Sequence, residues 1–162
     1  MGFYEELFRA LEEAKIRYLV VGGVAVVLHG FVRATADLDL MVALDPENLK
    51  TFVALMKKMG YQPKIPVAIE EFLLAKNRKA WREEKGMLVF SLYHPKKNSE
   101  LIDIFVDEPI PFNEAYDRRL TIPLGGLQIA VASTEDLIKL KQQAGRAQDL
   151  EDIQALEDLR KK

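Results

Sequence analysis

The stretch that decides the fold is residues 19–42, LVVGGVAVVLHGFVRATADLDLMV. The β-branched and aromatic run from Ile16 to Val21 predicts a buried strand that ends at Gly22-Gly23, where the glycines indicate a sharp change of direction. The apolar residues Val24 to His29 predict a short buried helix. Asp37 to Leu44 begins with alternating acidic and apolar residues, which predicts a second strand. The stretch therefore predicts a strand, a helix and a strand, with a glycine turn and a pair of carboxylates close together.

The carboxylate pair consists of Asp37 and Asp39, which are two residues apart and leave the same face of a strand with origins about 6 to 7 Å apart. Two such carboxylates can share one magnesium ion or hold two metal ions about 3.5 to 4 Å apart. The alternative is that alternating acids and leucines mark the solvent-facing side of an edge strand. Asp103, in the apolar run LIDIFV, is the best candidate for a third acid, because burying it there is costly without a cation or hydrogen bonds.

Gly22-Gly23 follows a predicted strand and opens a predicted helix, so its free backbone N–H groups could receive phosphate oxygens. Alone, such a pair is equally typical of a tight turn. Thirteen residues then separate it from Asp37. The joint occurrence of the glycine turn and the carboxylate strand favours a site that binds a metal ion and a nucleotide triphosphate.

Composition sets the wider limits. The 162 residues, 49% of them hydrophobic, predict a single domain with one core, and the net charge of -2 gives no general field for nucleic acid. The absence of cysteine excludes disulfides and thiolate ligands, so any metal must be held mainly by oxygen. Acidic residues near the N-terminus and the lack of a long apolar run favour a cytoplasmic protein without a membrane span.

The rest of the chain predicts a mixture of helices and strands. Helices are expected at residues 3–15, at 46–59 with Asp45 as N-cap, at 65–86, at 111–119 as a short helix or loop, after Ser133 or Thr134, and at 147–162. Further strands are expected at 87–93, 101–106 and 127–131, with a turn at 94–98. Because strands and helices do not alternate regularly, we expect an α+β fold in which helices flank a mixed β-sheet.

The pattern of GG, thirteen residues and then Asp37-Leu-Asp39-Leu resembles the signature of the nucleotidyltransferase-like (DNA polymerase beta-like) superfamily. Arg33-Ala-Thr35-Ala-Asp37-Leu-Asp39 is similar to the R-x-T-x-D-x-D form of the small AbiEii-type toxin nucleotidyltransferases. The stretches 133–141 and 145–153 are similar to the closing helices of that group, so the resemblance covers nearly the whole chain.

By that resemblance, Gly22 and Gly23 would contact the triphosphate, and Asp37 and Asp39 would bind Mg²⁺ or Mn²⁺. Asp103 would be the third catalytic carboxylate, as a metal ligand or as the base for the acceptor hydroxyl. It is matched by its strand context and not by a fixed spacing.

The same resemblance implies that Lys141 and Asp149 face the nucleotide from the C-terminal helices. Two positions depart from the pattern: Gln148 stands where relatives often have a basic residue, and Gly23 where many have serine. Lys141 on a charged helix is otherwise typical of a solvated lysine. Asp149 could instead cap the last helix.

Four further features could have either a functional or a structural role. Arg33 could neutralise phosphate or pair with a nearby acid to hold the loop before Asp37. Thr35 is expected to bond the turn backbone more readily than a ligand. His29 is expected to be a satisfied core or capping histidine. The basic run around Trp81 could track an RNA backbone, but a solvated helix face with Trp81 in the core is favoured.

Two functions follow from the resemblance. The first is a magnesium-dependent enzyme that moves an NMP from an NTP to a hydroxyl acceptor, which could be tRNA, a protein or a small molecule. The second is a non-catalytic nucleotidyltransferase-like module that binds a cognate toxin or antitoxin in a defence system. A purely structural α+β domain is the third possibility.

Overall fold

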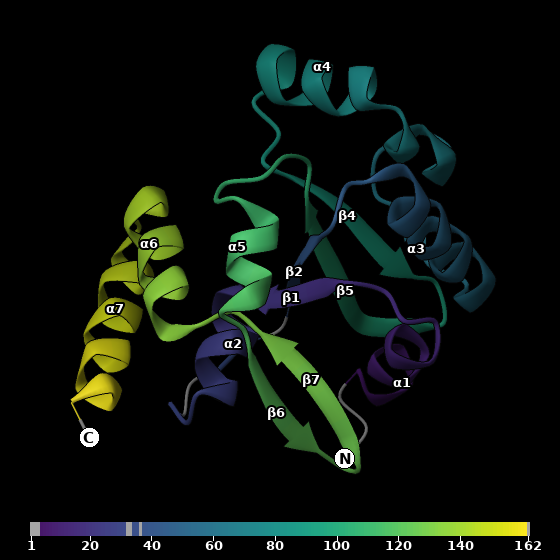
Figure 1. The fold of residues 1–162 in the computed structure, drawn as a ribbon. Helices are drawn as coiled ribbons and strands as arrows, with labels where there is room; N and C mark the ends of the chain where they lie inside the picture. The colour runs from purple at the N-terminus through teal and green to yellow at the C-terminus, as the bar shows by residue number, and fades with distance from the viewer. Residues whose placement is uncertain (1–3, 32–33, 36, 162) are drawn as a thin grey trace.

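The computed structural model describes residues 4–31, 34–35 and 37–161. Its elements, shown in Figure 1, are α1 (Glu5–Glu13), β1 (Tyr18–Val21), α2 (Gly22–Leu28), β2 (Leu38–Val42), α3 (Pro46–Met59), β3 (Gln62–Pro63), the 3₁₀-helix η1 (Ile69–Leu73), α4 (Ala75–Lys85), β4 (Val89–His94), β5 (Lys97–Phe105), α5 (Phe112–Asp117), β6 (Leu120–Leu124), β7 (Leu127–Val131), α6 (Thr134–Ala144) and α7 (Ala147–Arg160).

The strands form one mixed sheet in the order β3-β4-β5-β2-β1-β7-β6. The pairs β1–β7 and β2–β5 are parallel, and the pairs β1–β2, β3–β4, β4–β5 and β6–β7 are antiparallel. The predicted α+β architecture with a mixed sheet and flanking helices is therefore confirmed.

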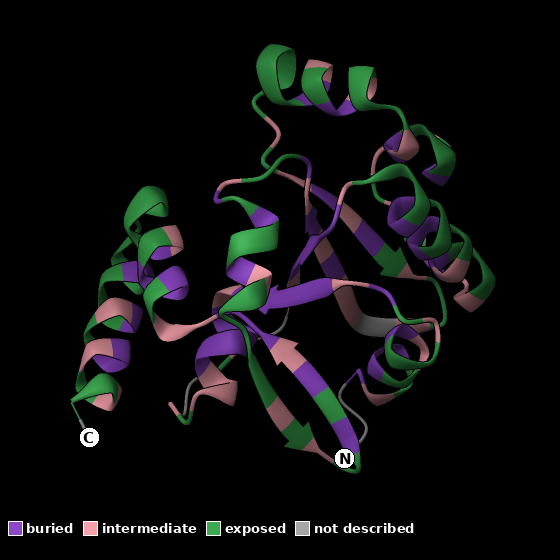
Figure 2. Ribbon diagram, viewed as in Figure 1, coloured by how far each residue is buried: buried purple, intermediate pink, exposed green. Residues whose placement is uncertain are grey.

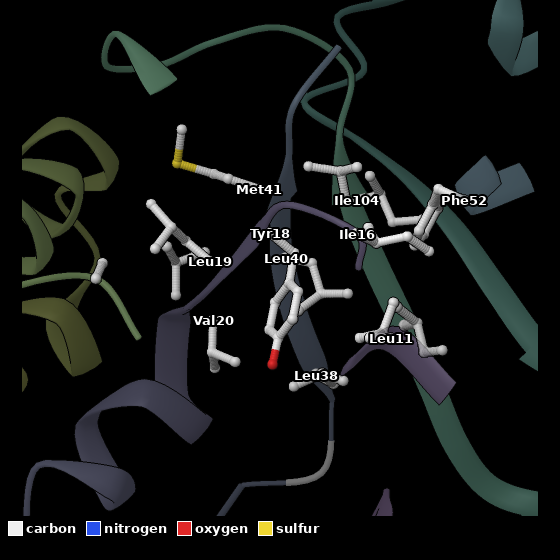
Figure 3. Close-up of a cluster of buried hydrophobic side chains, with 14 of the residues drawn as sticks. Leu11, Ile16, Tyr18, Leu19, Val20, Leu38, Leu40, Met41, Phe52 and Ile104 are labelled. Atoms are coloured by element: carbon white, nitrogen blue, oxygen red, sulfur yellow. The ribbon is translucent and has the colours of Figure 1, made fainter. Parts of the chain in front are cut away.

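The core lies along the central strands. Leu38, Leu40, Ile102 and Ile104 are completely buried on one face, under α1 and α3 (Figure 2). In the close-up of Figure 3, Leu11, Phe52 and Ile104 lie on one side of β1 and β2, and Leu19 and Met41 lie on the other. Helices therefore cover both sides of these two strands.

Most of the predicted elements are present. Asp45 is the N-cap of α3, where its carboxylate accepts a hydrogen bond from the backbone N–H of Asn48 at 3.1 Å, and Gly60 ends the helix with φ 93°. Ser133 caps α6 in the same way through the N–H of Asp136. The local capping chemistry thus locates these ends from the sequence alone.

The segment 65–86 differs from the continuous helix that we expected. It holds a loop, η1 and α4, because Pro66 lacks an N–H and Val67 bonds back to Ile65 at 2.8 Å in a tight turn. The turn between β4 and β5 is also shorter than predicted, since β4 runs to His94 and β5 starts at Lys97. Strand β6 was not predicted because it contains Pro123, which an edge strand tolerates.

Candidate active site

Gly22 leaves room for the side chain of Asp39 in the candidate site. They lie side by side because β1 and β2 are antiparallel, with Val21 opposite Asp39. Gly22 has φ +69°, and a Cβ at that position would lie 2.8 Å from the Asp39 Cγ and overlap the carboxylate. Glycine is therefore required here for its backbone conformation and also for the space that Asp39 occupies.

Asp39 and Asp103 are neighbours on parallel strands, because β2 and β5 pair with these two residues in register. Residues in register share a face of the sheet, and neighbouring strands are about 4.8 Å apart. Asp103 is also held from its other side, where the Ser91 hydroxyl of β4 donates a hydrogen bond to Asp103 Oδ1 at 2.6 Å. The sheet thus brings together two acids that are far apart in the chain.

The carboxylates influence one another electrostatically. Burial, and then the negative charges of Asp103 and Asp37, raise the pKa of Asp39 to about 7. Burial and the charge of Asp103 also raise the pKa of Asp37, which lies just before β2. These shifts have the direction expected for acids that face each other in a partly desolvated site.

A cavity of about 320 Å³ adjoins Asp37 and Asp39. The other residues that line it are Gly23, Ala34, Thr35, Lys141, Arg146 and Gln148. The sequence-predicted residues Gly23, Thr35, Asp37, Asp39 and Lys141 therefore meet around one hollow. Asp103 lies beside it on β5, and Arg33 falls outside the described residues.

The helices α6 and α7 lie side by side at the left of Figure 1 and are joined by buried charges. Lys141 Nζ lies 3.3 Å from Asp149 Oδ1 and 2.8 Å from Asp152 Oδ2, and all three side chains are at most 6% exposed. Asp149 also accepts a hydrogen bond from the backbone N–H of Arg146 at 3.1 Å, so it closes the first turn of α7. The capping alternative for Asp149 is confirmed.

Arg146 is a site residue that the sequence reasoning missed. Its Nε donates to Asp149 Oδ2 at 2.8 Å, yet its side chain remains 74% exposed and lines the cavity. Burial alone would raise the pKa of Asp149, but hydrogen bonds from Arg146 and the charge of Lys141 outweigh burial and lower it. The signal was the Gly145-Arg146 pair before the acidic helix start, because the glycine ends α6 with φ 67° and turns the arginine toward the cavity.

The donor chemistry suits a hard divalent cation, because carboxylate oxygens are the ligands that Mg²⁺ and Mn²⁺ prefer. Burial and then the neighbouring carboxylates raise the pKa values of Asp37 and Asp39, which indicates an excess of negative charge that a cation would relieve. Within the described part of the chain, however, no three His, Cys, Asp or Glu side chains are arranged closely enough to hold one metal ion. Binding would require the carboxylates to move together.

Two other predictions concern residues outside the cavity. His29 bonds the Ala132 carbonyl oxygen through Nε2 at 3.0 Å and the Thr134 hydroxyl through Nδ1 at 3.3 Å, as expected for a satisfied histidine. Trp81 is buried and stacks on Phe90 with ring centroids 5.1 Å apart, which confirms its core position.

The sheet, the glycine turn and the carboxylate strand together define a nucleotidyltransferase-like protein. The chain belongs to a family described as nucleotidyltransferase of unknown function (DUF6036), whose model matches residues 3–161. It is thus a transferase by family. The comparison with curated protein sequences gives no significant match. None of the described helices is long and apolar enough to cross a membrane.

Solved structures with the same fold include three nucleotidyltransferases of low sequence identity. The lincosamide antibiotic adenylyltransferase LnuA, bound to lincomycin, has a TM-score of 0.60 and 17% identity, over 95% of this chain and 94% of that one. ANT(2'')-Ia in complex with adenylyl-2''-tobramycin has a TM-score of 0.57 and 16% identity, over 93% and 83%. A putative nucleotidyltransferase from Thermotoga maritima has a TM-score of 0.57 and 15% identity, over 92% and 86%. At these identities the likeness concerns the fold alone.

Proposed function

We propose that the protein transfers an NMP from an NTP to a hydroxyl acceptor with the help of Mg²⁺ or Mn²⁺. The observation that carries this proposal is the placement of Asp39 and Asp103 on neighbouring strands, beside a cavity that Lys141 and Arg146 also line. Acids for a cation and basic groups for phosphates thus lie within one site.

The cavity side of the site would hold the triphosphate. The first N–H groups of α2 have no partner within the helix, and Gly23 brings the backbone close to the cavity. Arg146 would bind phosphate oxygens as a fork-shaped donor that Asp149 holds in place. Lys141 would add positive charge from α6, and Thr35 would close the side of the loop before Asp37.

The other side would hold the acceptor. Asp103 would take the proton of the acceptor hydroxyl, whose oxygen forms a bond to the α-phosphorus while the bond from that phosphorus to the bridging oxygen breaks and pyrophosphate leaves. Ser91 would keep the Asp103 carboxylate in position through its hydrogen bond. A divalent cation held by Asp37 and Asp39 would neutralise charge on the phosphates during this displacement.

The acceptor class is part of the proposal. Two fold neighbours are an adenylyltransferase bound to lincomycin and a protein in complex with adenylyl-2''-tobramycin, which supports a small hydroxylated molecule as one kind of acceptor. A tRNA end or a protein hydroxyl is the other kind. The narrower likeness to AbiEii-type toxins would add a cognate toxin or antitoxin partner, and in that case the protein could act as a binding module without turnover.

Binding and turnover are tested separately. If the proposal is correct, Mg²⁺ with ATP, CTP, GTP or UTP raises the melting temperature of the protein, and Asp37→Ala and Asp39→Ala abolish the shift. The matched control is Asp158→Ala, which removes an exposed acid from α7. Label transfer from a radioactive NTP to total tRNA, protein or small molecules of a cell lysate then measures turnover. Binding without any Asp-dependent transfer would favour the non-catalytic module.

A further inference from the structure

The row of site residues on the sheet continues beyond Ser91. Gln62 and Pro63 of β3 pair with Tyr93 and Leu92 of β4, so the next residue, Lys64, lies opposite Ser91 and donates its backbone N–H to the Ser91 carbonyl oxygen at 2.9 Å. Residues directly opposite each other share a face. One face of the sheet therefore carries Asp39 of β2, Asp103 of β5 and Ser91 of β4 in order, and Lys64, the residue after β3, stands next in this row.

This face is open, whereas the opposite face of the same strands is sealed. The side chains that point to the opposite face are at most 1% exposed: Phe90, Leu92, Ile102 and Ile104. The side chains on the open face are half-buried or exposed: Val89, Ser91, Tyr93, Leu101, Asp103 and Phe105. We call these six residues with Lys64 the open sheet face. A partly exposed sheet surface with apolar side chains beside carboxylates is suited to binding a substrate.

The open sheet face lies on the opposite side of the acids from the cavity. The cavity is lined by α6, α7 and the start of α2, whereas Lys64 belongs to the segment that follows β3 at the far edge of the sheet. A triphosphate in the cavity would present its α-phosphorus to the acids from one side. An acceptor must then approach from the other side for an in-line displacement.

Lys64 supplies the charge of this face. It is exposed, and no ion pair involving it occurs among the described residues. Its charge is near enough to lower the pKa of Asp37, although burial and Asp103 outweigh this effect. The Ser91 hydroxyl lies between Lys64 and the acids. Tyr93 lies two residues along β4, opposite Leu101 and Gln62; it is 37% exposed, and its hydroxyl donates to Gln62 at 3.1 Å.

We propose that the open sheet face binds the acceptor, and that Lys64 selects acceptors that carry a phosphate or carboxylate group besides the hydroxyl that reacts at Asp103. The backbones of Asp103 and Lys64 lie about 10 Å apart, which is two strand spacings, and the flexible Lys64 side chain can extend toward the reacting hydroxyl. The acceptor's apolar part lies over Tyr93 and Leu101. A polyamine acceptor is disfavoured, because its cationic groups meet Lys64. This inference rests on the proposed function.

The test uses four sugars that share a ring of hydroxyls and differ in charge: glucose 6-phosphate, glucuronate, glucose and glucosamine. Each is titrated at millimolar concentration into the full chain loaded with Mg²⁺ and a non-hydrolysable ATP analogue, and binding is followed by NMR at the Ser91, Tyr93 and Leu101 amides. We expect the two anionic sugars to bind about threefold to tenfold more tightly than glucose, and glucosamine to bind least, as for one partly exposed charged contact.

Variants of Lys64 show whether this cation is the cause. Lys64→Ala should bring the four dissociation constants within about twofold of one another, Lys64→Glu should reverse the preference, and Lys64→Arg should keep it. Lys58→Glu, an equal charge change at an exposed position of α3, should leave the preference intact. No preference for the anionic sugars in the unaltered protein, or the same preference in Lys64→Glu, would overturn the inference.

The ATP analogue reports on the proposed function independently. Its binding perturbs the Gly23 and Thr35 amides at the cavity and should be unchanged in all Lys64 variants but lost in Asp39→Ala. If the analogue does not bind but the anionic sugars still bind more tightly than glucose, the inference about the acceptor face is supported and the proposed nucleotide site is refuted. If the analogue binds but the four sugars bind equally, the nucleotide site is supported and the inference about the acceptor face is refuted.

Discussion

Replacing Gly22 with alanine tests the contact on which the whole site depends. Two costs arise. A residue with a Cβ at φ +69° costs about 1 to 2 kcal/mol of folding stability, and the overlap with the Asp39 carboxylate adds a further penalty of about 1 to 3 kcal/mol, as for an overfilled core. We therefore expect Gly22→Ala to lower the free energy of unfolding by about 2 to 5 kcal/mol.

Gly86→Ala separates the two costs. Gly86 has φ +64°, which is close to that of Gly22, but a Cβ there would meet nothing within 4 Å. Urea denaturation followed by circular dichroism should give a loss of only about 1 to 2 kcal/mol for this variant. The excess loss in Gly22→Ala measures the overlap with Asp39.

The double variant Gly22→Ala/Asp39→Ala completes the experiment. Because the carboxylate is then absent, the two severest overlaps are removed and only the contact with the Cβ of residue 39, at 3.0 Å, remains; the coupling energy of the double-mutant cycle should be about 1 to 3 kcal/mol. If Gly22→Ala is no more destabilising than Gly86→Ala, or if the coupling energy is zero, Asp39 does not occupy the space beside Gly22 and the geometry of the site is wrong.

Three more predictions concern single residues. Because burial and neighbouring carboxylates raise the pKa of Asp39 from 3.8 to about 7, the free energy of unfolding should fall as the pH rises through this range, and Asp39→Asn should flatten the curve in urea titrations at each pH. Lys141→Met removes the buried ammonium group that contacts both Asp149 and Asp152 and should cost about 3 to 5 kcal/mol in the same assay. Ser91→Ala should lower kcat about 10-fold to 100-fold with NTP affinity unchanged, measured by pyrophosphate release.

Each of these has its own control. Saturating Mg²⁺ should oppose the loss of stability at high pH in the unaltered protein and not in Asp39→Asn. Lys97→Ala breaks the exposed pair with Glu6 and should cost less than about 1 kcal/mol, so an equal effect of Lys141→Met would disprove the role of burial. Ser91→Thr retains the hydroxyl and should recover activity, and a failure to do so would argue against the hydrogen bond to Asp103.

Much of the fold could be predicted because its signals are local. A cap such as Asp45 acts within one helical turn, and the alternation of Asp37 to Leu40 acts within one strand. The mixed sheet followed from the irregular succession of strands and helices. The prediction of one helix at residues 65–86 was wrong because the charge pattern does not show the break at Pro66. Strand β6 was not predicted because Pro123 is unusual within a strand, although an edge strand tolerates it.

The candidate site was predictable in part for the same reason. Gly22, Asp37 and Asp39 come from one short segment whose spacing carried the signal. Asp103 could be proposed only from its apolar surroundings. Arg146 was missed because the Gly145-Arg146 pair marks only the end of one helix and the start of the next. Arg146 is about 110 residues from Asp37 and Asp39 in the sequence, and only the fold brings it to the cavity that they line.

The sequence by itself determined the strand, helix and strand of residues 19–42, since backbone conformation and side-chain alternation there depend on neighbours in the chain. Only the tertiary structure decided that Asp103 stands beside Asp39, that Asp149 is a buried partner of Lys141 and Arg146, and that Lys64 ends the row across the open sheet face. Those relations depend on strand order and register, which arise when the sheet buries its core and which no spacing along the chain specifies.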